Sequence, residues 1–342
     1  MRVRRALAVL ALGVPHADCI LPKTLSGAGS ELAPTEDGSY RGNNPALARC
    51  ARIHDHAVDD MASMGHDDSR EEPNAQYRGD KFLVAKDEAH KPYFLFVHVG
   101  HACGGTIEQT LVNEKKRLKA HLYPDGPNKH GPAFDTVHVH PVRRNVLDAA
   151  EHVLIVLRDP VTRFISAFNS NACMYEGHAP NRCQRRVVPT MELNVNGAAS
   201  KELAEVKSFM NCYPNITSFA DQLDDKTFCG EQARNLANPP WEVHIKKGSC
   251  YYLSPAMLPV LRKKDVYIVH TESCDADIQG IPQWLGLDMK FHMPKESHTG
   301  LDFPHYADRP SKIGLERLKR HLSHEYALQE QLEKIAARKH SR

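Results

Sequence analysis

The sequence of 342 residues lacks any hydrophobic run of about 18 residues, the length that indicates a membrane-spanning helix. It also has little excess of either charge, because 44 lysine and arginine residues face 42 aspartate and glutamate residues. The formal net charge of +2 gives no overall field that would attract nucleic acid. We therefore expect no nucleic-acid partner, and any anion-binding site must be local.

Several common motifs are missing as well. No CxxC pair occurs, so a structural zinc site has little support and we expect no metal. The sequence contains neither GxxxxGK[ST] nor GxGxxG, which removes the best support for an ordinary ATPase or a dinucleotide-binding protein. No internal repeat is present. The composition, 41% hydrophobic and 25% charged, is sufficient for one large globular domain or two modest ones.

Nine cysteines fit an oxidising compartment, and the odd number leaves at least one thiol free or lost with a leader. Disulfides are a more natural use for them than zinc, with Cys173 and Cys183, or Cys212 and Cys229, as examples of pairs. The connectivity itself does not follow from the sequence. A sequon at Asn215 agrees with a luminal route and predicts a glycoprotein.

The chain divides into three parts by composition. Residues 1–17 combine a basic start with the apolar run Ala6–Val14, which is too short to span a bilayer and predicts a secretory signal peptide. A chance apolar start is the alternative, and membrane contact is expected only through this segment if it is not cleaved. Residues 18–91 are polar and acidic, which predicts a solvated, disordered stalk. Cation binding by its acidic run is the alternative. Residues 92–338 form the predicted folded domain.

Four hydrophobic, β-branched runs in this domain predict strands that are covered on both faces: residues 93–99, 136–139, 153–157 and 266–269. Helical patterns separate them. The alternation predicts an α/β domain with three layers, in which helices flank a central parallel sheet. Residues 311–338 carry leucines at helical spacing and predict one amphipathic packing helix.

The first predicted strand leads through a glycine-rich turn into a predicted helix. Backbone N–H groups and the helix dipole can hold an anion at such a turn, and Thr106 adds a hydroxyl. A tight turn without a ligand is the alternative. The candidate binding residues are His101, Ala102, Cys103, Gly104, Gly105 and Thr106.

The third predicted strand ends in Arg158, beside a second predicted helix start. Asp159 is suited to cap that helix with Pro160 at its first position, and Ser166 lies eight residues beyond the arginine. An arginine at such a place is a natural phosphate clamp. The alternative for Arg158 is a structural pair with a carboxylate.

Together the two elements resemble the PAPS-dependent sulfotransferases, and the Golgi carbohydrate sulfotransferases in particular. Phe96–Thr106 is similar to their phosphosulfate-binding loop, strand-HxPKTGGTS, and Arg158–Phe168 to their 3′-phosphate motif, RDPxxRFxSAF. The likeness covers Tyr93–Leu332, and Thr271-Glu272 followed by Ile281–Leu287 resembles the late acidic-plus-WLG segment of the family. The resemblance implies a P-loop-like fold, PAPS as co-substrate, a carbohydrate or glycoconjugate acceptor, and the Golgi lumen.

Carried over by motif position, Gly104, Gly105 and Thr106 would hold the 5′-phosphosulfate. Arg158 and Ser166 would hold the 3′-phosphate, which suits a bidentate guanidinium and a hydroxyl. Arg163, inside the same helix start, is assigned to structure.

The catalytic residues are the least determined part of the resemblance. His101 stands where the family has a lysine, and an ordinary imidazole is mostly neutral at pH 7. A general base must also accept a proton from the acceptor hydroxyl. His138 and His140 point to one face at a strand end, and His140 is the preferred base. A metal pair or buried core histidines are the alternatives for them.

The resemblance and the residues together predict a luminal sulfotransferase that moves a sulfuryl group from PAPS to a hydroxyl. Two alternatives stay open. The first is a catalytically silent PAP- or PAPS-binding module, which the histidine at position 101 would explain. The second is a P-loop kinase, which has less support because the Walker lysine and an evident aspartate for magnesium are missing.

Overall fold

The computed structural model describes residues 44–63, 92–124, 132–138, 140–175, 212–234, 245, 247–293 and 309–340. Every described residue belongs to one compact unit of the chain, residues 33–342. The predicted leader lies outside the described residues, and so does Cys183 of the predicted Cys173–Cys183 pair.

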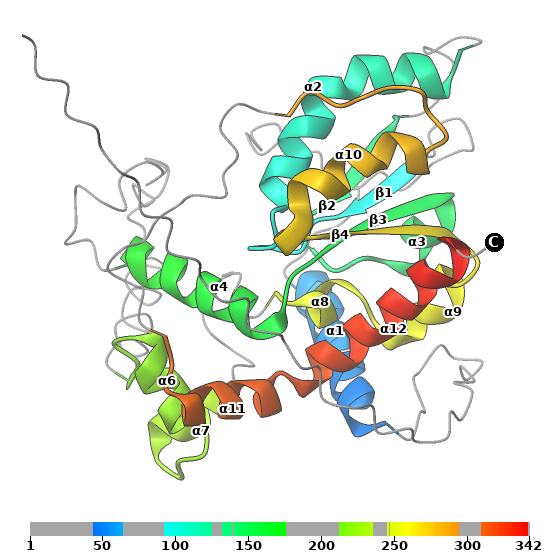
Figure 1. The fold of residues 1–342 in the computed structure, drawn as a ribbon. Coiled ribbons are helices and arrows are strands. Elements are labelled where there is room, and N and C mark those ends of the chain that lie inside the picture. The colour runs from blue at the N-terminus through cyan, green and yellow to red at the C-terminus, as the bar shows by residue number, and fades with distance from the viewer. Residues whose placement is uncertain are drawn as a thin grey trace, which may run out of the picture. The chain divides into compact units, whose positions relative to one another are not determined.

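Four parallel strands form the sheet, in the order β2-β1-β3-β4 (Figure 1). Their bounds are Phe94–Val97 for β1, Phe134–Val137 for β2, His152–Leu157 for β3 and Asp265–His270 for β4. All four residues of β1 and all but the first of β3 are buried, as their continuous hydrophobic runs predict. The predicted α/β domain with a central parallel sheet and flanking helices is therefore confirmed.

Helices cover the sheet on both faces. In the view of Figure 1, α2 and α10 lie above the sheet, whereas α1, α8 and α12 lie below it. Both α10 and α12 contact β4. From β1 to residue 284 the described helices are α2 (Gly104–Leu122), α3 (Arg144–Ala149), α4 (Pro160–Tyr175), α6 (Ile216–Gln222), α7 (Phe228–Arg234), α8 (Ser249–Tyr252), α9 (Leu258–Leu261) and α10 (Cys274–Trp284). Two short 3-10 turns, η3 (Pro255–Met257) and η4 (Thr271–Ser273), complete this part of the chain.

The strand order places a topological switch point between β1 and β3. After β1 the chain moves to β2 on one side, and it then returns to β3 on the other side of β1. Ligands of open α/β sheets bind at such a point, beyond the carboxyl ends of the strands. The segments that follow Val97 and Leu157 flank this point.

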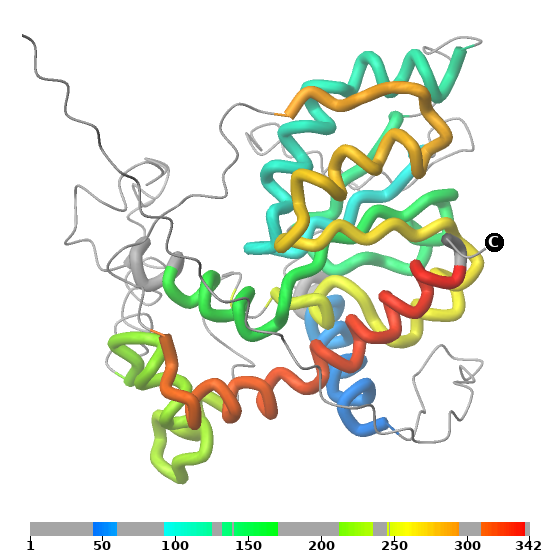
Figure 2. The backbone as a smooth tube through the Cα atoms, in the orientation of Figure 1, coloured from blue at the N-terminus to red at the C-terminus, as the bar shows by residue number. Residues whose placement is uncertain are grey.

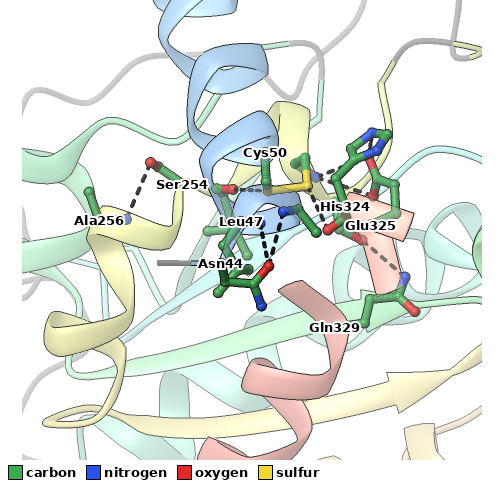
Figure 3. Close-up of a disulfide and its surroundings, with 12 residues drawn as sticks. Asn44, Leu47, Cys50, Ser254, Ala256, His324, Glu325 and Gln329 are labelled. Atoms are coloured by element: carbon green, nitrogen blue, oxygen red, sulfur yellow. Dashed lines mark hydrogen bonds and ion pairs between the residues drawn. A yellow bond between two sulfur atoms is a disulfide. The ribbon is translucent and has the colours of Figure 1, made fainter. Parts of the chain in front are cut away.

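One part of the expected stalk is folded. Residues Pro45–Ser63 form helix α1, which contacts α8, η3 and α12. A disulfide joins Cys50 of this helix to Cys250 of α8 (Figure 3). His54 donates a hydrogen bond from Nε2 to the carbonyl oxygen of Val142 at 3.1 Å. The expectation of a solvated stalk over residues 18–91 is therefore wrong for residues 45–63. The folded domain begins earlier than the expected residue 92.

The carboxyl end contains two consecutive helices where one was expected. Helix α11 (Lys312–His321) packs against α4 and α6, and α12 (Ser323–His340) packs against α1, α8 and β4 (Figure 2). Helices α4, α6 and α11 share a second apolar cluster around Phe164, Phe168 and Phe219. Helix α11 therefore packs on this second cluster, whereas α12 packs mainly beside the sheet.

Three disulfides join described cysteines: Cys50–Cys250, Cys103–Cys274 and Cys212–Cys229. The last is a predicted pair and is confirmed. Disulfides persist in oxidising compartments, so they indicate an extracellular or secretory-pathway protein. Among the described helices, none has the length and apolarity needed to cross a membrane.

Candidate anion-binding site

The turn between β1 and α2 has an unusual backbone. His101 and Cys103 adopt positive φ angles of 62° and 48°, and α2 begins directly afterwards at Gly104. The N–H groups of Thr106 and Ile107 donate to the carbonyl oxygen of Cys103 at 3.0 and 3.3 Å. The N–H groups at the first two positions of a helix have no acceptor within the helix. At Gly104 and Gly105 they are suited to hold an anion.

The two glycines face different surroundings. A Cβ at Gly104 would lie 1.9 Å from Cδ2 of His98, so the imidazole ring fills the space that a side chain would need. A Cβ at Gly105 would meet no atom within 4 Å. Gly105 is exposed, whereas Thr106, whose hydroxyl was expected to contribute to the anion site, is buried at 2% exposure. Access to the turn is therefore through the open side at Gly105.

Arg158 connects this turn to the end of β3. Its Nη1 donates to the carbonyl oxygen of His101 at 3.0 Å, and Oγ of Ser166 lies 3.3 Å from Nδ1 of His101. Asp159 caps α4, because its Oδ1 accepts the N–H of Thr162 at 2.8 Å. The structure thus brings both predicted motifs to one residue, His101.

His101 is enclosed by positive charge. Burial, followed by the charges of Arg163, Arg158 and His98, lowers the pKa of His101 to about 3. The imidazole is therefore neutral at pH 7 in the free protein. It does not supply the positive charge of the lysine that the resemblance would place there.

Arg163 is buried and holds neighbouring backbone. It donates to the carbonyl oxygens of Ile245 at 3.1 Å and Lys247 at 3.4 Å. The negative charge of Glu325, a buried residue on α12, favours the charged form of the Arg163 guanidinium. Arg163 therefore acts as a structural group one turn before Ser166, as the sequence predicts.

Three side chains meet beside the glycine turn. His98 and His138 follow paired strands β1 and β2 in register, and their ring centroids are 3.7 Å apart. Oε2 of Glu108 lies 3.5 Å from Nδ1 of His98, and this contact lowers the pKa of Glu108. Burial lowers the pKa of His138 to about 3, which makes it a weak base. His140 lies two residues further on and is half-buried.

Sequence reasoning assigned no site residue to the segment after β4, although Thr271-Glu272 carries part of the resemblance. Cys274 at the start of α10 forms a disulfide with Cys103, and the charge of Glu272 favours the charged form of Arg158. The only sequence signal for Cys274 was the number of cysteines. In the part of the chain that the structure describes, no group of three or more histidine, cysteine or acidic residues could hold a metal ion.

Comparisons of this chain with protein-family models, curated proteins and solved structures find no match.

Proposed function

We propose that this chain binds PAPS, or its product PAP, at the glycine turn and Arg158, and that it transfers the sulfuryl group to a hydroxyl of a carbohydrate or related acceptor. The observation that carries the proposal is the convergence of Arg158 and Ser166 on His101, at the switch point of the sheet. PAPS requires two anion sites on one face, because it has a 3′-phosphate and a 5′-phosphosulfate. A P-loop-like turn and a strand-end arginine supply both.

The residues present fit such a ligand. Gly105 leaves open space where any side chain would stand, and it carries one of the two N–H groups that lack an acceptor within the helix. The described hydrogen bond of the Arg158 guanidinium is to a neutral carbonyl oxygen, and the charges of Glu272 and Asp159 favour its charged form. Exchange of that neutral acceptor for a phosphate dianion would give a stronger, charge-assisted hydrogen bond.

Sulfuryl transfer then depends on positioning and on proton removal. As the acceptor oxygen bonds to sulfur, its proton passes to a base, and the electron pair of the broken S–O bond goes to the 5′-phosphate of PAP. The low pKa of His138 leaves His140 as the preferred base. The first N–H groups of α2 would stabilise the charge that develops on the leaving oxygen.

A catalytically silent PAP-binding module is the second candidate. The observation that favours it is the low pKa of His101, which leaves the leaving oxygen without a nearby cation at position 101. In this case the same turn and arginine would bind the nucleotide without turnover. The sulfotransferase candidate includes a location in the Golgi lumen. The disulfides support the secretory pathway in general and not this compartment in particular.

Calorimetric titration of the full chain with PAP, with ADP as the ligand that lacks a 3′-phosphate, tests the site. We expect PAP to bind at least about tenfold more tightly, because one charge-assisted contact contributes about 1.5–3 kcal/mol. Equal affinities would overturn the proposal. The variant His101→Lys then separates the two candidates in a PAPS turnover assay: a silent module gains activity, whereas an enzyme that relies on His101 does not.

A further inference from the structure

A short segment after β4 contacts both halves of the candidate site. The hydroxyl of Thr271 donates to the carbonyl oxygen of Leu157 at 3.1 Å, directly before Arg158. Three residues later Cys274 is bonded to Cys103 in the glycine turn. The pairing of β3 with β4 explains this position, since Leu157 and His270 are partners in register and the two strands end together.

Cys103 occupies a backbone conformation that side chains rarely adopt. Its φ of 48° lies in the left-handed region, which costs a residue with a Cβ about 1–2 kcal/mol. Such conformations persist only where the surroundings enforce them. The covalent bond to Cys274 is one restraint on Cys103, which directly precedes Gly104 and Gly105 and their N–H groups.

The segment after β4 also influences the charge of Arg158. The charge of Glu272 favours the charged guanidinium of Arg158, and Arg158 itself donates to His101 two residues before Cys103. The turn, the arginine and the start of α10 are thus linked by one disulfide and two hydrogen bonds. A displacement of α10 would move the turn relative to Arg158.

We propose that the Cys103–Cys274 disulfide positions the glycine turn for anion binding, and that Cys274 is a positioning residue for the nucleotide site. This inference rests on the proposed function. It predicts that the 5′-phosphate contacts require the oxidised cysteine pair. The 3′-phosphate would contact Arg158, directly after β3, and Ser166 on α4, and these contacts do not require the disulfide.

The test compares two single variants of the full chain. Cys274→Ser removes the bond to the turn without changing any residue of the turn. Cys250→Ser is the matched control, because it opens a disulfide of similar sequence separation, 200 residues against 171. Each variant is titrated with PAP and with adenosine 3′-monophosphate, which lacks the 5′-phosphate. Thermal unfolding curves set a temperature at which both variants are folded.

We expect Cys274→Ser to bind PAP at least about tenfold more weakly, since a loop that must be ordered on binding loses affinity. Its affinity for adenosine 3′-monophosphate and both affinities of Cys250→Ser should stay close to those of the wild type. A purely structural role would instead weaken both ligands together, and unchanged PAP binding would also overturn the inference. If the free thiol prevents folding, the double variant Cys103→Ser/Cys274→Ser gives the same comparison. A wild type without preference for PAP over ADP would overturn the proposed function, and the inference with it.

Discussion

Arg158 and His101, which are 57 residues apart in the sequence, are joined by a hydrogen bond of 3.0 Å from a guanidinium nitrogen to a backbone carbonyl oxygen. The bond connects the end of β3 to the turn after β1. It leaves a cationic side chain at the edge of a turn whose first helical N–H groups have no acceptor within α2. The two elements of the proposed nucleotide site are thus adjacent in the free protein.

Arg158→Ala should weaken PAP binding by about 10- to 100-fold and change ADP binding much less, because it removes a charge-assisted contact to the 3′-phosphate. Calorimetry on both ligands measures the two effects. Arg144→Ala is the matched control, since Arg144 is exposed and pairs with Asp148 on one helix at 3.2 Å. A similar loss for PAP in the two variants would show that Arg158 has no specific role.

The two glycines of the turn should respond in opposite ways. Gly104→Ala would force its Cβ into the ring of His98, so it should lower the thermal midpoint markedly. Gly105→Ala meets no atom and exchanges a glycine for a better helix former, so the stability should be unchanged or higher by up to about 1 kcal/mol. It should nevertheless weaken PAP, because a methyl group then occupies the open side of the turn. Normal PAP binding by Gly105→Ala would argue against ligand approach from that side.

The stability should fall as the pH is lowered from 7 to 5. Burial lowers the pKa of His138 and His324 to about 3, as it does for His101, whereas in the unfolded chain each takes up its proton near 6.5. The unfolded state therefore binds more protons over this interval, which costs about 2 kcal/mol for each such histidine. His270 acts in the opposite direction, because its contact with Glu333 raises its pKa.

Urea unfolding at pH 7 and pH 5 measures this loss. The variant His138→Gln has no group to titrate at that position, so its loss of stability between the two pH values should be smaller by about 2 kcal/mol. An equal loss in variant and wild type would show that His138 titrates normally in the folded protein.

Glu325→Ala should cost about 3–5 kcal/mol of stability, because it removes the buried carboxylate whose charge favours the charged guanidinium of the buried Arg163. Both carboxylate oxygens of Glu325 also accept the N–H of Cys250 at 3.3 Å. Glu330→Ala on the same helix is the control, since its ion pair with Lys334 is exposed and should contribute less than about 1 kcal/mol. Chemical denaturation of both variants measures the two losses of stability. Similar losses would show that the charge of Glu325 does not stabilise the buried Arg163.

Asn215 offers a test of the secretory route. Its Oδ1 accepts the N–H of Ser218 at 2.8 Å and caps α6, which leaves the amide nitrogen as the atom that a glycan would modify. We expect Asn215→Ala and Asn215→Asp both to lose a glycan when the chain is expressed through the secretory pathway. Only Asn215→Ala should lose about 1 kcal/mol of stability, because aspartate retains the capping oxygen. An unmodified wild type, measured by mass, would contradict the predicted glycan.

The sheet was predictable because its strands are buried on both faces and need continuous hydrophobic runs. Strand β2 is the exception at its start: it begins at Phe134 instead of the expected residue 136, since Asp135 interrupts the run. An edge strand can include such a residue because it is only half-buried there. The break between α11 and α12 was not predictable, because the leucines on either side of Leu322 keep a helical spacing across it.

The candidate site was predictable only where local sequence patterns determine it. Patterns typical of strand ends and helix starts located Arg158 and the glycine turn, and the parallel pairing of β1 with β3 brings the two together. The Cys103–Cys274 bond joins residues 171 positions apart, so only the complete fold determines it. Helix α1 was missed because the acidic average of its region conceals the few residues that face inward, among them Leu47 and Cys50.

Helix α1 also determines where the protein can be shortened. A chain that starts at residue 92, where the hydrophobic strands begin, would contain Cys250 but not Cys50. Its unpaired thiol could then form mixed or intermolecular disulfides, and the surfaces of α8 and α12 that α1 covers would be open to solvent. A fragment that retains the residues from Asn44 onward keeps the disulfide and this cover.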